Sequence, residues 1–246
     1  MKSNSETGHA KNVVLFERLI SDVNTFGTAY NPSKEIIKLT ALQALHTSAK
    51  AAITATNLAE SVYKNAVDER EATFSPLGKT VTSAYNILKS SDSTIQSDET
   101  VKTIYRKLQG KRAGTKLTDA EIETLKAEGK TVTQNSISQM GYDNRLANFD
   151  RFITMLSSIP AYNPNEEEFK VNGLRTYYNE LATKNTNVMS TDSVLESARS
   201  NRNHVLYAPS TGLLDIASDV KSYVKGIFGS TSPQYKQISK LRFKTL

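Results

Sequence analysis

The sequence predicts an all-α protein, and two observations support that prediction. Apolar side chains recur at three- and four-residue spacing over long stretches, which is the period of a helix. No stretch shows a sustained alternation of β-branched residues, so strand signals are weak. A third observation, the repetition of short sequence blocks, predicts an elongated helical bundle of two tandem, pseudo-twofold-related helical units with long central helices.

The repeated blocks keep the same order and a nearly constant offset of 132 or 133 residues. We therefore divide the chain into helical unit A (5–108), a connector with a short helix (109–137) and helical unit B with a basic C-terminal tail (138–246). Below, the two helical units are called repeat A and repeat B, and we expect them to pack as one domain with a single hydrophobic interior. The matched blocks are 16–20 and 149–153, 29–32 and 161–164, 74–76 and 207–209, and 107–108 and 240–241.

Each repeat is expected to begin with a short helix, at about 10–25 in repeat A and 143–158 in repeat B. Asn31 then resembles a helix N-cap with Pro32 at the first helical position, where the missing N–H does no harm. Neither glycine nor proline interrupts residues 33–75, so a helix of about 40 residues is predicted there. Repeat B has the same arrangement in Asn163 and Pro164, followed by Glu166, Glu167 and Glu168, which we expect in a first helical turn.

The long helix of repeat A carries a heptad seam made mostly of small residues, which would let a neighbouring helix approach closely. The shorter helices cannot cover such a stripe, so the two long helices are expected to lie side by side. Three further side chains, Ile53, Leu58 and Val62, are expected to widen the buried face. The seam consists of Leu42, Leu45, Ala49, Ala52, Thr56, Ala59, Tyr63 and Ala66.

Ser75-Pro76 is predicted to end the long helix and start a third one, with Leu77 and Val81 on its inner face. Fourth helices are expected at about 98–109 and 233–241. In the connector, Thr118 and Glu121 have the spacing of a capping box, and Gly129 would close the short helix that follows. The flanking stretches 110–114 and 131–136 have the composition of mobile polar loops.

The chain has 246 residues, a formal net charge of +6 and no cysteine, which excludes a disulfide scaffold, a thiolate metal site and a cysteine nucleophile. The polar start lacks an apolar core of the kind that signal peptides have. No stretch approaches the length of a transmembrane helix, so we expect no membrane insertion and a cytoplasmic location.

Two basic segments without acidic residues lie at 100–118 and 220–246, at the ends of the two repeats. They are expected either to bind anions such as phosphate, as in a nucleic-acid-binding protein, or to form solvated basic faces. The possible anion-binding residues are Lys102, Arg106, Lys107, Lys111, Arg112, Lys236, Lys240, Arg242 and Lys244.

No catalytic, cofactor-binding or metal-binding motif accompanies these segments. His9, His46 and His204 do not form a ligand-spaced pair, and the three consecutive glutamates suit a helix dipole better than a metal. We therefore expect a chain that is not an enzyme and needs no cofactor: a non-catalytic helical scaffold that acts through protein–protein interaction or self-assembly. The alternative is nucleic-acid binding through the two basic segments. A pore-forming role is disfavoured because a lysine, asparagine or glutamate interrupts every apolar stretch that could enter lipid.

Several short stretches resemble a family of uncharacterised helical proteins from Bacteroidetes-type bacteria. The resemblance extends over almost the whole chain and implies a bacterial source. The family has no assigned activity, so no functional residue is carried over from it. The stretches are 5–12, 30–34, 106–112, 211–213 and 232–237.

Overall fold

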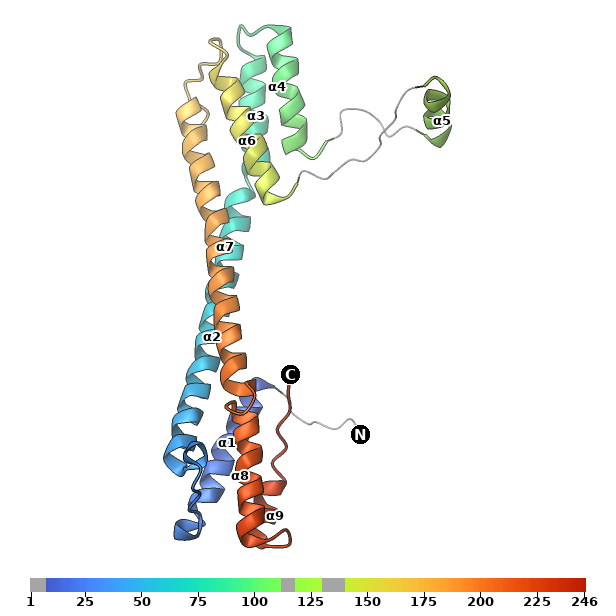
Figure 1. The fold of residues 1–246 in the computed structure, drawn as a ribbon. Helices are drawn as coiled ribbons and strands as arrows, with labels where there is room; N and C mark the ends of the chain where they lie inside the picture. The colour runs from blue at the N-terminus through green and yellow to red at the C-terminus, as the bar shows by residue number, and fades with distance from the viewer. Residues whose placement is uncertain (1–7, 112–117, 130–139) are drawn as a thin grey trace, which may run out of the picture. The chain divides into compact units, whose positions relative to one another are not determined.

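The computed structural model describes residues 8–111, 118–129 and 140–246, and every regular element in these ranges is helical. The all-α prediction is therefore confirmed (Figure 1). The elements in chain order are α1 (His9–Asn24), η1 (Gly27–Ala29), η2 (Glu35–Ile37), α2 (Leu39–Phe74), α3 (Leu77–Lys89), α4 (Ile95–Leu108), α5 (Asp119–Ala127), α6 (Tyr142–Ser157), α7 (Val171–Tyr207), α8 (Leu213–Phe228) and α9 (Pro233–Ser239).

The helices group into two compact units that do not coincide with repeats A and B. Unit 1 consists of Met1–Lys64 and Ser190–Leu246, and unit 2 consists of Asn65–Met189. Unit 1 therefore contains α1, the first part of α2, the last part of α7, α8 and α9. Unit 2 contains the last part of α2, α3, α4, α6 and the first part of α7, and the residue range of α5 falls within it. Each unit thus combines the opening helices of one repeat with the closing helices of the other.

In unit 1 the core lies where α8 packs against α1 and α9 (Figure 1). Phe16 and Leu19 of α1 and Ile216 and Val220 of α8 are fully buried there. The long helices contribute Leu42 and Ala49 from α2 and Leu206 from α7.

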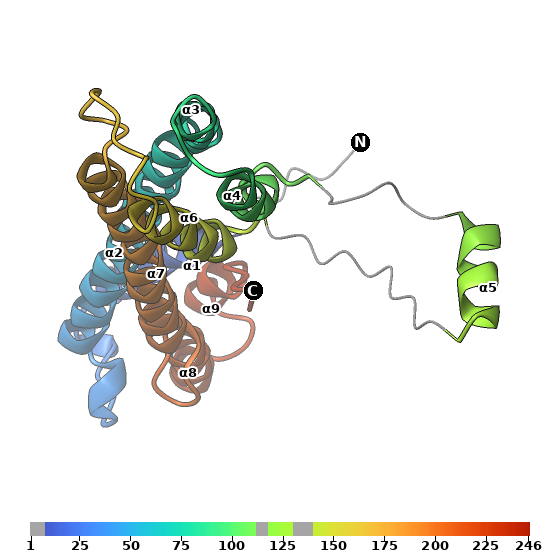
Figure 2. The same cartoon turned by 90° about the horizontal axis from the view of Figure 1, so that it is seen from above.

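Unit 2 has a separate cluster of buried apolar residues, in which α4 packs against α3 and α6 (Figure 2). Phe149 and Phe152 of α6 are its largest fully buried side chains, together with Phe74 at the end of α2. Most buried apolar residues of the described chain fall into these two clusters, one in each unit, whereas Ala52, Ala59, Ala66, Val188 and Leu195, all on the two long helices, belong to neither.

The predicted heptad seam of α2 faces inward, with Leu45 and Tyr63 half-buried and its other members buried. In unit 1, the Thr56 hydroxyl donates to the Ala198 carbonyl oxygen of α7 at 3.2 Å. In unit 2, the Tyr177 hydroxyl donates to the Thr73 carbonyl oxygen at 2.7 Å. The two long helices therefore lie side by side within each unit, as predicted.

The prediction that Leu58 and Val62 widen the buried face is wrong. Leu58 is 65% exposed and Val62 is 47% exposed, whereas Ile53 is half-buried. The reason is that the unit 1 cluster of buried apolar residues reaches along α2 only as far as Ala49 and Ile53, so Leu58 and Val62 lie beyond it.

The predicted caps at Asn31-Pro32 and Asn163-Pro164 are also wrong, because both stretches are irregular and the long helices begin later. In each case a tyrosine hydroxyl holds the intervening loop. Tyr30 donates to the Ile37 carbonyl oxygen at 2.6 Å, and Tyr162 donates to the Phe169 carbonyl oxygen at 2.7 Å. The loop thus closes on its tyrosine before the helix starts.

This loop also explains why Glu166, Glu167 and Glu168 lie in a turn that precedes α7 and not in its first helical turn. A Cβ atom at Gly173 would lie 2.1 Å from the Glu167 carbonyl oxygen, so the turn packs directly on the backbone of α7. Continuous helix from Pro164 is incompatible with that packing.

The shorter elements agree with the sequence. The helices expected at 10–25 and 143–158 are α1 and α6, and the fourth helices are α4, capped by Thr94, and α9, capped by Ser232. The capping box of Thr118 and Glu121 opens α5. Residues 112–117 and 130–139, which include most of the loops expected at 110–114 and 131–136, lie outside the described residues.

Candidate functional site

The basic residues predicted near the end of repeat A belong to α4 and the turn after it, in unit 2. Lys102 donates to Glu99 at 2.5 Å, and this hydrogen bond lowers the pKa of the Glu99 carboxyl. Part of the positive charge of this segment is therefore compensated locally. The other predicted members are the half-buried Arg106 and Lys107, the exposed Lys111, and Arg112, which lies outside the described residues.

The basic residues predicted in repeat B lie on α9 and in the segment after it, in unit 1. Lys236, Lys240, Arg242 and Lys244 are all exposed, and no ion pair involving them is found among the described residues. By contrast, Lys34 of the same unit pairs with Asp219 at 2.6 Å. The structure therefore leaves the charge of the C-terminal segment available to a partner.

Lys221 has a different environment from its basic neighbours. It is half-buried, its ammonium group donates to the Leu241 carbonyl oxygen, and it lies 5.0 Å from the centre of the Phe243 ring. Burial lowers the pKa of Lys221. This lysine fastens the C-terminal segment to α8.

The two basic segments lie in different compact units, and the formal charge follows that division. Unit 1 has 15 Lys+Arg and 9 Asp+Glu, whereas unit 2 has 16 of each. The net charge of +6 therefore resides in unit 1. This imbalance makes unit 1 the better candidate for contact with an anionic partner.

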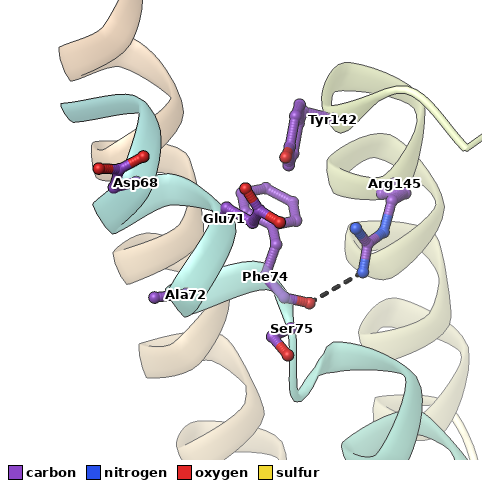
Figure 3. A pocket seen from close by; sticks show the side chains of 7 residues that line it. All are labelled: Asp68, Glu71, Ala72, Phe74, Ser75, Tyr142 and Arg145. Carbon is purple, nitrogen blue, oxygen red and sulfur yellow. Dashed lines mark hydrogen bonds between the residues drawn. The ribbon is translucent and has the colours of Figure 1, made fainter. Parts of the chain in front are cut away.

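A pocket of about 600 Å³ lies in unit 2, where the end of α2 meets α6 (Figure 3). Arg145 of α6 donates to the Phe74 carbonyl oxygen at 2.9 Å, and its guanidinium lies 5.2 Å from the centre of the Phe74 ring. The pocket combines exposed carboxylates with a half-buried cation and two aromatic rings. Its lining residues are Asp68, Glu71, Ala72, Phe74, Ser75, Tyr142 and Arg145.

A polar network supports the wall formed by Tyr142. The Arg70 guanidinium lies 4.0 Å from the centre of the Tyr142 ring and donates to the Asn185 side-chain oxygen at 3.3 Å. The Asn185 amide in turn donates to the Asp143 carboxylate at 2.8 Å. The network runs from Arg70 of α2 through Asn185 to Asp143 of α6 and holds the Tyr142 ring against the Phe74 ring. The centres of these two rings are 4.8 Å apart.

Unit 1 has a related corner at the start of α1. The His9 ring lies beside the Tyr207 ring, with Nδ1 of His9 2.7 Å from the tyrosine hydroxyl. Burial and the nearby Arg202 lower the pKa of His9. Asn12, which is only 3% exposed, donates to the Lys244 carbonyl oxygen at 2.7 Å and accepts from the Lys244 N–H at 3.1 Å. The C-terminal segment is thereby held against α1.

An exposed stripe runs along α2 within unit 1, beside the buried seam. Its members follow the same heptad spacing, and the last two are the large apolar residues Leu58 and Val62. On α7, Val194 is also 59% exposed. We call this the α2 stripe, and it consists of Ala44, Ser48, Ala51, Ala55, Leu58 and Val62.

The remaining candidates from the sequence stay apart. His46 is half-buried, and its Nε2 atom has no hydrogen-bond partner, while His204 is exposed. Among the described residues, no three His, Cys, Asp or Glu side chains are grouped so that they could hold a metal ion. None of the helices in the described ranges combines the length and the apolar character that a membrane crossing requires.

No sequence motif pointed to the pocket residues Phe74, Tyr142 and Arg145. A signal for them exists, since they lie 133 residues from Tyr207, His9 and Asn12, which form the corner of unit 1.

Comparison with protein-family models, curated proteins and solved structures finds no match for this chain.

Proposed function

We propose that the chain is a non-catalytic helical scaffold that acts by self-association, through the α2 stripe of unit 1. The observation that supports this is the exposure of Leu58 and Val62, two large apolar residues that the sequence predicted to be buried beside the seam. Contiguous apolar side chains on a protein surface mark interaction sites. A heptad stripe in particular is suited to contact with another helix.

A second copy of the same stripe fits this surface when the two helices run antiparallel. With Ala51 opposite Ala55, Leu58 faces Ser48 of the second copy and Val62 faces Ala44. Each large side chain then meets a small one, which is the condition for close interdigitation. The stripe spans about 27 Å at 1.5 Å per residue, enough for several layers of contact.

The test is the mass of the full chain in solution, measured by sedimentation velocity and by light scattering over roughly 1–100 μM. We expect the dimer fraction to increase with concentration and the double variant Leu58→Glu/Val62→Glu to stay monomeric. Val14→Glu is the matched control, because Val14 is 55% exposed on α1 of the same unit. A wild-type chain that is monomeric throughout, or a double variant that associates like the wild type, contradicts the proposal.

A second candidate function is nucleic-acid binding by unit 1. It is favoured by the unpaired exposed charges of Lys236, Lys240 and Arg242 and by the net charge of +6 in that unit. Contacts between lysine or arginine and phosphate weaken steeply with salt. Labelled DNA and RNA are titrated at about 50 mM salt, with Lys236→Ser/Lys240→Ser/Arg242→Ser as the test variant. Absence of binding, or binding that this variant leaves unchanged, eliminates this candidate.

A further inference from the structure

The pocket of unit 2 occupies a corner that corresponds to the one where unit 1 holds its own C-terminal segment. Tyr142 and Phe74 correspond to His9 and Tyr207 at an offset of 133 residues. In both units the two rings contact each other, with centres 4.8 Å apart in unit 2 and 5.7 Å apart in unit 1. The same pair of positions therefore frames both corners.

In unit 1, this corner binds a non-helical backbone. The side-chain amide of Asn12 makes two hydrogen bonds with the peptide groups of Lys244, one as donor and one as acceptor. Lys244 belongs to the segment 241–246, which has no regular structure. Its own side chain is exposed, so the backbone is what Asn12 recognises.

In unit 2, the residue that corresponds to Asn12 is Arg145. It uses one donor on the Phe74 carbonyl oxygen, while its Nε atom is buried without a hydrogen-bond partner. A guanidinium carries five N–H donors, so Arg145 retains donors for a further carbonyl oxygen. Arginine cannot accept a hydrogen bond, but Glu71 lines the same pocket and provides an acceptor (Figure 3).

We propose that the pocket beside Phe74 binds an extended peptide segment that carries lysine or arginine. Arg145 donates to a backbone carbonyl oxygen of the peptide, and Glu71 and Asp68, both exposed, attract its basic side chains. In unit 1, the corresponding corner is occupied by the chain's own basic, non-helical segment around Lys244. The bound peptide would occupy the equivalent position in unit 2. This goes beyond the proposed self-association and does not depend on it, because the α2 stripe lies in unit 1 and the pocket in unit 2.

The probe is a fluorescent peptide with the sequence of residues 239–246, titrated into the full chain and followed by anisotropy. We expect saturable binding with a Kd below about 1 mM. Asp68→Asn/Glu71→Gln is expected to weaken it about tenfold, because two attractive charges are removed. Arg145→Gln is expected to weaken it as well. The matched control is Asp92→Asn/Glu123→Gln, which removes two exposed carboxylates outside the pocket.

Four results overturn the proposal. The first is no saturable binding by the wild-type chain. The second is binding that Asp68→Asn/Glu71→Gln leaves unchanged, a variant that removes only exposed carboxylates and is expected to fold normally. The third is equal binding of a peptide in which all basic residues are replaced by alanine. Binding lost in Asn12→Ala but kept in the pocket variants also contradicts it, since the probe then exchanges with the chain's own segment in unit 1.

Discussion

In unit 1, the corner between α1 and the end of α7 is closed by His9, Tyr207 and the C-terminal segment, whereas in unit 2 the corner between α6 and the end of α2 is an open pocket. The loops before the long helices, by contrast, are held in the same way. Tyr30 and Tyr162 each donate to a carbonyl oxygen seven residues later. The shared contacts are those that keep the helices in position, and the differences lie in surface charge and in the corner residues.

That difference separates two roles. Unit 1 carries the whole net charge and the α2 stripe, so it is the candidate for self-association and for contact with anions. Unit 2 is neutral overall and has the pocket with its exposed carboxylates. A change that alters one unit and spares the other is therefore the most informative experiment.

The largest effect is expected from removing a corresponding core phenylalanine in either unit. Phe16 and Phe149 are both fully buried, and Phe→Ala leaves a cavity, so each variant should lose about 3–5 kcal/mol of unfolding free energy. Urea denaturation measures the loss. Hydrogen exchange should show lost protection in α1 and α8 for Phe16→Ala, and in α3, α4 and α6 for Phe149→Ala. Equal loss of protection in both units by either variant would contradict the division into units.

A smaller effect is expected from Asn12→Ala, which leaves the Lys244 peptide groups without their side-chain partner. The expected loss is about 1–3 kcal/mol, with faster hydrogen exchange in residues 241–246. Asn24→Ala, at the exposed end of the same helix, serves as the control. If the segment exchanges at the same rate in both variants, Asn12 does not hold it.

Tyr162→Phe tests the loop anchor and adds a pH dependence. Loss of the hydrogen bond to the Phe169 carbonyl oxygen should cost about 1 kcal/mol at neutral pH. Burial, and then Glu166, raise the pKa of Tyr162 from 10.0 to about 12. The folded state therefore favours the protonated phenol, and that stabilisation is complete below pH 10 and is lost as the pH rises towards 12.

The Tyr162→Phe variant has no hydroxyl that can ionise at this position. Its free energy of unfolding should therefore fall less than that of the wild type between pH 10 and 12. Denaturation at several alkaline pH values measures the difference. Burial likewise raises the pKa of Tyr30, so Tyr30→Phe should change the alkaline stability of unit 1 in the same direction. Parallel pH profiles of the wild type and both variants would contradict the raised pKa of these two hydroxyls.

The smallest effect is expected from Thr56→Val. This substitution gives α2 the same residue that α7 has at the corresponding position, Val188. The buried Thr56 hydroxyl donates to the carbonyl oxygens of Ala52 and Ala198. Both carbonyls also belong to helices, so they keep backbone partners when the hydroxyl is removed. The unfolding free energy should change by less than about 1 kcal/mol. A loss several times larger would mean that this contact joins the long helices more strongly than apolar packing does.

The sequence was informative wherever the signal is local. The inner face of α2, the stop at Ser75-Pro76 and the capping box at Thr118 all depend on residues within a few turns of one another. The cap predicted at Asn31-Pro32 does not form, because the competing interaction, the hydrogen bond from the Tyr30 hydroxyl to the Ile37 carbonyl oxygen, has no recognisable sequence pattern. Leu58 is exposed because the cluster of buried apolar residues in unit 1 ends before it. The spacing of apolar residues along α2 does not predict where that cluster ends.

The pocket was missed for a related reason. Arg145 and Phe74 are 71 residues apart, and neither matches a binding motif. Long-range pairs of this kind follow from which helices share a unit, and the repeats alone suggested a different grouping. The internal duplication itself stays a prediction, which the matched tyrosine anchors and ring pairs support.

The nesting of unit 2 within the sequence of unit 1 has a consequence for synthesis on the ribosome. All of unit 2 emerges as one uninterrupted stretch, so it can acquire its core while translation continues. Helix α1 leaves the tunnel before unit 2 but can contact α8 only after some 190 further residues, a delay of roughly 10–40 s at 5–20 residues per second. Until α8 emerges, the apolar face of α1 lacks this partner, and a chaperone that binds exposed apolar helices would favour correct completion of unit 1.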